Sequence, residues 1–142
     1  MTEAFALQEV GSGSLLCQVA AHYSRRGRSG LLDPLPELRA FVPPATVSDR
    51  HTYLAFSNSR LQKWLPGKRV NTFVISGAET DVCVLSMVLT AVDLGYRVII
   101  AKDVLCSSAN KSLDAPLSLC AKRFDVQIEL ADSRQIFVNR HR

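Results

Sequence analysis

The fold of this chain is decided by residues 70–103, which read VNTFVISGAETDVCVLSMVLTAVDLGYRVIIAKD. Residues 70–75 are a short, mostly apolar run ended by a serine–glycine pair, which predicts a buried strand. From Thr80 onward, apolar residues recur at helical spacing and also fill the other faces, so we expect a helix that is covered on most sides. Residues 97–101 are a second apolar run of strand length. The stretch is therefore predicted to form a βαβ unit.

The pattern continues on both sides of this unit. Apolar residues from Leu113 to Phe124 have helical spacing, and residues 126–130 alternate as in a strand nearer the sheet edge. The three predicted strands start about 30 residues apart, the length of consecutive right-handed βαβ units. A short strand at residues 46–48 and a helix around Leu61 precede them. The predicted fold class is α/β: a three-layer, Rossmann-like fold with a mostly parallel sheet flanked by helices.

Cys83 lies in the first turn of the predicted helix, just beyond the carboxyl end of a central strand. The amide groups and the positive end of the helix dipole at that place stabilise a thiolate. Ligands of open α/β sheets also bind beyond the carboxyl ends of strands. Two interpretations stay open from position alone: a nucleophile, or a buried structural cysteine.

The N-terminal residues 1–34 are predicted to be a divergent segment, and residues 35–142 the main domain. Apolar residues between Leu15 and Tyr23 have the spacing of one face of a short helix. His22 lies beside that face, where a lone histidine is more often structural than catalytic. No strand ending in an aspartate is expected before Leu35.

Composition excludes several classes of protein. The 142 residues fit one domain, and a hydrophobic content of 47% is enough for a core. The net charge of +4 comes from basic residues without interleaved aromatic side chains, which argues against nucleic-acid binding. The four cysteines have no zinc-site spacing, so we expect no metal, and no cofactor is implied. Neither a signal peptide nor a membrane span is evident, so a cytoplasmic protein is expected.

Two segments resemble the isochorismatase-like cysteine hydrolases, a family that includes nicotinamidases and N-carbamoylsarcosine amidohydrolases. Residues 77–84, GAETDVCV, with Ala91, the Gly-Tyr-Arg-Val of residues 95–98 and Asp103, are similar to the family's core signature. Residues 43–56, PPATVSDRHTYLAF, are similar to its upstream pattern. The resemblance covers roughly residues 35 to 135 and favours the nucleophile interpretation of Cys83.

The resemblance implies a chemistry of three groups: a cysteine that attacks a carbonyl, an aspartate that carries the proton, and a lysine that supports the charge. Cys83 matches the nucleophile. The link between Ala78 and Glu79 is expected to be a non-proline cis peptide, with the Glu79 and Cys83 amides aimed at one oxyanion position. A small molecule with an amide-like C–N bond is the expected substrate. The expected pocket residues are Ala78, Thr80, Tyr53 and Phe56.

The chain departs from the family pattern at two positions. Arg50 stands where the family has lysine; it keeps the charge but cannot give up a proton at neutral pH. The family's aspartate ends a first strand that this chain is expected to lack, as if it were shortened at its N-terminus. That loss would leave an apolar sheet edge uncovered, so we expect a homo-oligomer.

Two further hypotheses compete with the hydrolase. One is a catalytically impaired remnant of the family that acts as a binding or oligomerisation module. The other is phosphate or nucleotide binding at the helix start near Thr80. The chain has no GxGxxG or GxxxxGK[ST] motif, and Glu79 and Asp81 would repel an anion, which argues against the last.

Overall fold

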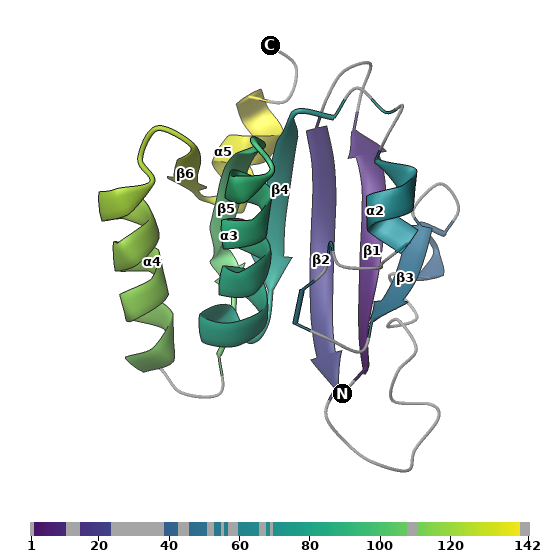
Figure 1. Cartoon of the computed structure of the whole chain (residues 1–142), viewed down its shortest axis with the longest axis horizontal. Coiled ribbons are helices and arrows are strands. Elements are labelled where there is room, and N and C mark those ends of the chain that lie inside the picture. Colours follow the sequence, from purple (N-terminus) through teal and green to yellow (C-terminus); the bar gives the residue numbers. More distant parts are fainter. Residues whose placement is uncertain are drawn as a thin grey trace.

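A computed structural model gives the arrangement of most of the 142 residues. It describes residues 2–10, 15–23, 39–42, 46–50, 53–54, 56, 60–65, 68, 70–107 and 111–139, and only the backbone for residues 2–10, 15–23, 46–50, 60, 62 and 111–113. Within these residues, six strands form one sheet in the order β3-β1-β2-β4-β5-β6 (Figure 1). The strands are β1 (Thr2–Val10), β2 (Leu15–Tyr23), β3 (Thr46–Arg50), β4 (Thr72–Gly77), β5 (Arg97–Leu105) and β6 (Ile128–Ala131).

The sheet is parallel apart from one strand. β2, β4, β5 and β6 pair in parallel, and β1 is antiparallel to both of its neighbours, β2 and β3. The predicted strands at residues 70–75, 97–101 and 126–130 are confirmed as β4, β5 and β6. β5 extends beyond its prediction to Leu105, and β6 begins at Ile128.

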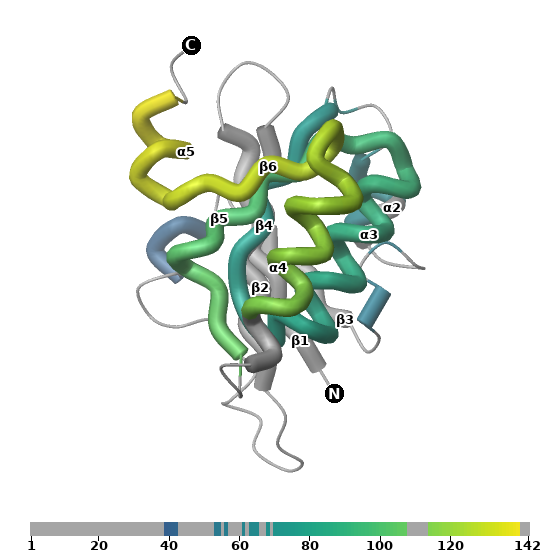
Figure 2. Tube along the Cα trace, turned by 90° about the vertical axis from the view of Figure 1, so that its left-hand side faces the viewer, coloured from purple at the N-terminus to yellow at the C-terminus, as the bar shows by residue number. Residues whose placement is uncertain are grey.

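Helices cover both faces of the sheet. They are α2 (Arg60–Trp64), the π-helical turn η2 (Thr80–Val84), α3 (Leu85–Asp93), α4 (Lys111–Arg123) and α5 (Ser133–Asn139). Figure 2 shows α3 and α4 on one side of β4, β5 and β6, and α5 on the other, so the predicted three-layer α/β class is confirmed. Among the described residues, no helix combines the length and apolar character needed to cross a membrane.

The core lies between the sheet and α3. Phe73 and Ile75 of β4 and Val98 of β5 are at most 1% exposed and pack with Met87 and Val88 of α3. Burial of this kind stabilises a fold by about 1.5–3 kcal/mol for each large apolar side chain. Alternate residues of β4 and β5 therefore mark the α3 face of the sheet.

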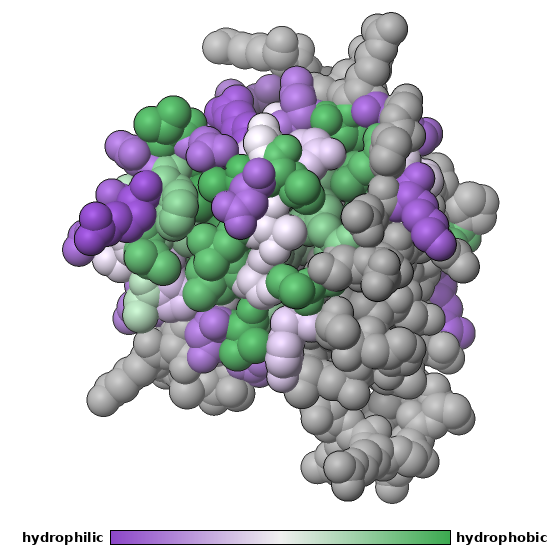
Figure 3. All heavy atoms as spheres, in the orientation of Figure 1, coloured by the Kyte–Doolittle hydropathy of each residue, from purple (hydrophilic) through white to green (hydrophobic). Residues whose placement is uncertain are grey.

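The predicted cover of the central helix is only partly present. Leu85 and Leu89 are half-buried, and Val82 and Leu94 are exposed by 40% and 56%. Figure 3 shows hydrophobic residues gathered on the molecular face that carries α3 and α4. The side of α3 that faces away from the sheet thus carries half-buried leucines together with polar residues, Ser86, Thr90 and Asp93.

The helix predicted for Leu15 to Tyr23 is wrong, because these residues form strand β2. The prediction followed the helical spacing of the apolar residues, although the run is apolar almost throughout, as in strands buried on both faces. Pairing with a distant part of the chain favours a strand over a helix for these residues. β4 presents unpaired N–H and C=O groups, and β2 pairs with it in parallel from Leu15↔Thr72 to Ala20↔Gly77.

The expectation of an uncovered sheet edge is also corrected. β1 and β2 are strands ahead of Leu35, and β2 occupies the edge of β4 that was expected to be open. The argument for a homo-oligomer from an open edge therefore fails, and the oligomeric state itself stays a prediction.

Candidate active site

Cys83 lies in η2, the turn that follows β4. The carbonyl of Glu79 accepts hydrogen bonds from the backbone N–H groups of Val82 (3.3 Å), Cys83 (2.9 Å) and Val84 (3.1 Å). The peptide bond between Ala78 and Glu79 is cis, as the family resemblance implied. The chain therefore turns between β4 and the helix, and the N–H groups of Val82, Cys83 and Val84 all donate to the Glu79 carbonyl.

The segment after β5 holds this turn in place. The Cys106 N–H donates to the carbonyl of Gly77 at 3.0 Å, and the Thr80 hydroxyl donates to the carbonyl of Cys106 at 2.9 Å. Thr80 is only 1% exposed. Because a buried hydroxyl without a partner is costly, this hydrogen bond fixes the start of η2 against the end of β5. Thr80, a predicted pocket residue, serves here as a structural link.

Ser107 brings two carboxylates together beside the turn. Its hydroxyl lies 3.0 Å from Glu79 Oε2 and 3.4 Å from Asp81 Oδ1. The sequence gives no signal for this contact, because Glu79 follows β4 and Ser107 follows β5. The two carboxylates at the helix start also argue against anion binding there.

Cys83 is buried, with 1% of its surface exposed. It does not belong to the hydrophobic cluster beneath α3, whereas Cys120, 2% exposed, does. The residues before Cys83 are less enclosed: Ala78, Glu79 and Asp81 are half-buried. Cys83 therefore lies beneath a turn that is itself less enclosed than the cysteine.

The other predicted site residues are spread more widely. Phe56 is 4% exposed and packs edge-to-face on Phe73 at 5.6 Å between ring centroids, so it is a core residue. Tyr53 is 42% exposed. Arg50 is the last residue of β3, at the sheet edge. Two strands separate β3 from β4, so their backbones are about three strand spacings, or roughly 14 Å, apart.

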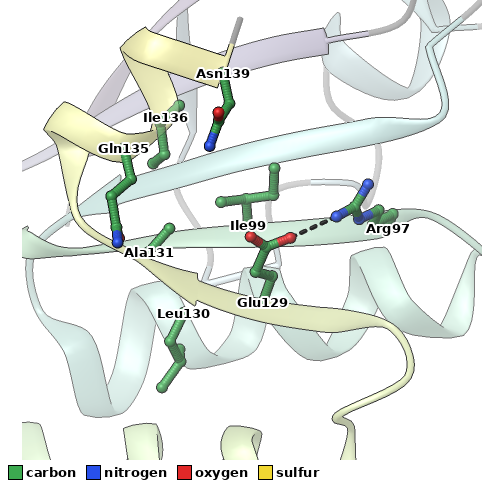
Figure 4. Close-up of a pocket in the computed structure, with 8 residues that line it drawn as sticks. All are labelled: Arg97, Ile99, Glu129, Leu130, Ala131, Gln135, Ile136 and Asn139. Carbon is green, nitrogen blue, oxygen red and sulfur yellow. Dashed lines mark hydrogen bonds and ion pairs between the residues drawn. The ribbon is translucent and has the colours of Figure 1, made fainter. Parts of the chain in front are cut away.

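A pocket of about 520 Å³ lies elsewhere, against β5, β6 and α5 (Figure 4). Ile99 and Ile136 supply apolar lining, while Gln135 and Asn139 from α5 and the ion pair of Arg97 with Glu129 supply polar groups. Ile99 alternates with Val98 along β5, so this pocket is on the sheet face opposite α3 and Cys83. It shares no residue with the predicted site.

Asp103 of the signature has a structural contact. The Ser133 hydroxyl donates to Asp103 Oδ2 at 2.6 Å, and the Ser133 N–H donates to Oδ1 at 2.7 Å. These two hydrogen bonds, the hydroxyl first, hold the pKa of the Asp103 carboxyl below its ordinary value. Asp103 thereby ties the first residue of α5 to β5.

Within the described part of the chain, no three histidine, cysteine, aspartate or glutamate residues cluster as metal ligands would. The described site contains a thiol, backbone amides and nearby carboxylates.

Comparison with known proteins gives the family. The isochorismatase domain matches residues 19–132. An uncharacterized isochorismatase family protein, PncA of Bacillus subtilis (strain 168), is 25% identical over 99 residues, which are 70% of this chain and 54% of that protein. The chain thus spans about half the length of this curated relative.

Solved structures show the same fold. A cysteine hydrolase from Pseudomonas syringae pv. phaseolicola 1448A superposes with a TM-score of 0.59 at 20% identity, covering 65% of this chain and 47% of that one. The nicotinamidase SaPncA from Staphylococcus aureus gives a TM-score of 0.53 at 26% identity, covering 58% and 52%. The domain match, the fold and the cysteine-bearing turn agree, and this chain belongs to the isochorismatase family.

Proposed function

We propose that this chain is a cysteine hydrolase that splits an amide-like C–N bond of a small molecule. The observation that carries the proposal is the position of Cys83 at the carboxyl end of β4, in a turn whose amide groups converge on one carbonyl. Relatives with similar folds are named nicotinamidases and a cysteine hydrolase, which supports a carboxamide as the substrate class.

In the proposed reaction, the Cys83 sulfur attacks the substrate carbonyl. The Glu79 and Cys83 amides receive the charge of the oxyanion, and Arg50 adds positive charge from the edge of the sheet. The Cys83 N–H is shared with the Glu79 carbonyl at 2.9 Å, so the oxyanion competes with that carbonyl for the same donor. Because Cys83 is 1% exposed, the turn at Ala78 must open to admit the substrate.

The test is ammonia release from nicotinamide, pyrazinamide and N-carbamoylsarcosine. Cys83→Ser should lower the hydrolysis of the preferred amide by at least about a thousandfold. Cys120→Ala is the matched control, since it removes a thiol that is equally buried but lies in the hydrophobic cluster. Hydrolysis by Cys83→Ser at the rate of the unmodified chain would refute the proposal.

A second candidate function is a binding module without turnover. The burial of Cys83 favours it, and β2 contains neither aspartate nor glutamate to carry a proton. Under this hypothesis, the exposed Val82 of η2 and Leu94, the residue after α3, pack against a second copy of the chain. Light scattering coupled to gel filtration measures the oligomeric state, and turnover of any amide in the panel removes this candidate.

A further inference from the structure

The carboxyl end of β2 lies beside the carboxyl end of β4, and the turn that carries Cys83 follows β4. β2 and β4 run in parallel, and Ala20 of β2 is the register partner of Gly77, the last residue of β4. β2 continues beyond this pair to Tyr23. His22 is therefore two residues past Ala20, beyond the last register pair of β2 and β4 and at the end of the sheet from which η2 follows.

The register also assigns His22 to one face of the sheet. Leu16, Gln18 and Ala20 are the partners of Phe73, Ile75 and Gly77. Because residues two apart along a strand share a face, His22 belongs to the same series. Phe73 and Ile75 pack beneath α3 together with Val84, the neighbour of Cys83. His22 is thus at the α3 face and at the end of the sheet where η2 begins.

A row of charged residues continues from His22 across the sheet. Glu3 of β1 is the register partner of His22, and it is also the partner of Arg50 on β3. Partners in a ladder share a face, and neighbouring strands lie about 4.8 Å apart. The order Arg50, Glu3, His22 therefore leads from the sheet edge toward β4, and Figure 1 shows the corresponding ends of β1, β2 and β4 at the bottom of the sheet.

We propose that His22 is the general base for Cys83 and that Glu3 positions its imidazole. This inference rests on the hydrolase function proposed above. Nucleophilic cysteines are activated by a base whose second nitrogen is oriented by a third group, and the row supplies such a set in the order Cys83, His22, Glu3. Histidine suits the task because its charge changes near neutral pH. Arg50 is the other register partner of Glu3, so the proposal places its positive charge next to the positioning residue.

The proton transfers balance as follows. The Cys83 sulfur forms a bond to the amide carbon, and the thiol proton passes to His22. The C–N bond breaks, and His22 gives this proton to the leaving nitrogen, so ammonia or an amine departs and a thioester remains. Water then adds to the thioester and gives one proton to His22. The S–C bond breaks, the acid leaves, and the Cys83 sulfur regains that proton.

The test compares His22→Ala with His141→Ala, which removes a histidine near the C-terminus. Hydrolysis of the preferred amide should fall by about 10²–10⁴-fold in His22→Ala and stay unchanged in His141→Ala. Added imidazole should restore part of the activity of His22→Ala, because it replaces the missing proton acceptor. Glu3→Gln should give an intermediate loss that Glu3→Asp partly reverses, as expected for a positioning residue.

A second measurement needs no substrate. Alkylation of Cys83 by iodoacetamide, followed by mass spectrometry, should be slower in His22→Ala than in the unmodified chain, while alkylation of the exposed Cys106 should not change. Circular dichroism checks that each variant is folded, and His22→Gln replaces His22→Ala if the latter is not.

The outcomes separate the two proposals. If Cys83→Ser is inactive and His22→Ala hydrolyses at the normal rate, the role of His22 is wrong and the hydrolase function stands. A loss in His22→Ala that imidazole does not relieve, with normal alkylation of Cys83, also overturns the role of His22. If the unmodified chain hydrolyses no amide, the proposed function fails, and the alkylation rates alone decide whether His22 acts on Cys83.

Discussion

The two halves of the sheet are built in different ways. From β4 to β6 the chain forms consecutive parallel strands joined by helices, and each strand leads into the next crossover. From β1 to β2 it forms an antiparallel pair, whose register runs from Thr2↔Tyr23 to Val10↔Leu15. Only the second strand of that pair touches the parallel half, through β4.

The comparison shows that the sheet position beside β4 can be filled by the second strand of an antiparallel pair as well as by a strand of a βαβ unit. A strand beside β4 needs backbone groups to pair with and a suitable length, and β2 meets both requirements although the element described before it is the strand β1. The chemistry at the end of that strand is less easily replaced. β2 has His22 near its carboxyl end and no acidic residue, so it does not supply the aspartate that the family resemblance implies.

If the parallel half supplies most of the stability, a truncation in its core should have the largest effect. Phe73→Ala removes a ring that is 0% exposed and packs edge-to-face on Tyr96 at 4.8 Å. We expect the free energy of unfolding to fall by about 3–5 kcal/mol, measured by urea denaturation. Val126→Ala is the control, because Val126 is 92% exposed and its loss should change stability by at most about 0.5 kcal/mol. If Phe73→Ala and Val126→Ala lowered the free energy of unfolding equally, the core would not lie around Phe73.

The pairing of β2 with β4 can be broken at one backbone group. Val19→Pro removes an N–H from a strand that has neighbours on both sides. The lost hydrogen bond and the steric demand of the ring should lower stability by about 2–3 kcal/mol, again measured in urea. Val19→Thr keeps the N–H and the branched side chain and serves as the control. A proline variant as stable as the threonine variant would mean that β2 does not complete the sheet.

The sequence predicts the parallel half because its signals are local. The apolar run ending at Ile75, the helical pattern after Thr80 and the run from Arg97 each have one interpretation, and all agree with a βαβ unit. For residues 15–23 the local pattern fits both a helix and a strand. The edge of β4 decides between them, and each residue of β4 that pairs with β2 lies 57 residues after its partner, as in Leu15↔Thr72, where no local pattern reveals it.

In the candidate site too, features with a local sequence signal could be predicted, and features that depend on distant contacts could not. The position of Cys83 and the cis link before Glu79 could be inferred from one contiguous signature. The contact of Ser107 with Glu79 and Asp81 could not, since it depends on how far β5 extends past β4. The burial of Phe56 was also missed, because a loop residue next to a polar segment gives no signal that its ring packs on Phe73.

A smaller effect on stability is expected at the hydrogen bond that links the segments following β4 and β5. Thr80→Val removes the hydroxyl that donates to the Cys106 carbonyl and leaves that acceptor unsatisfied. Stability should fall by about 1–2 kcal/mol, and alkylation of Cys83 should become faster as the turn loosens. Thr90→Val is matched in size; it removes a hydroxyl that donates to the Ser86 carbonyl within α3, and should change neither quantity much. Faster alkylation in Thr90→Val alone would contradict the proposed link.

The smallest effect concerns the attachment of α5 to β5, and it should depend on pH. Ser133 lowers the pKa of Asp103, so the ionised carboxylate stabilises the folded state. This contribution is complete above the unfolded pKa of about 3.9 and is lost as the pH falls through the lower pKa of the folded chain. Asp103→Asn should therefore melt at a slightly lower temperature than the unmodified chain at pH 7, and the two melting temperatures should converge in strong acid. Asp125→Asn, an exposed aspartate in the turn before β6, should show no such convergence. A difference for Asp103→Asn that persists at the lowest pH would assign the contact to the shape of the side chain and not to its charge.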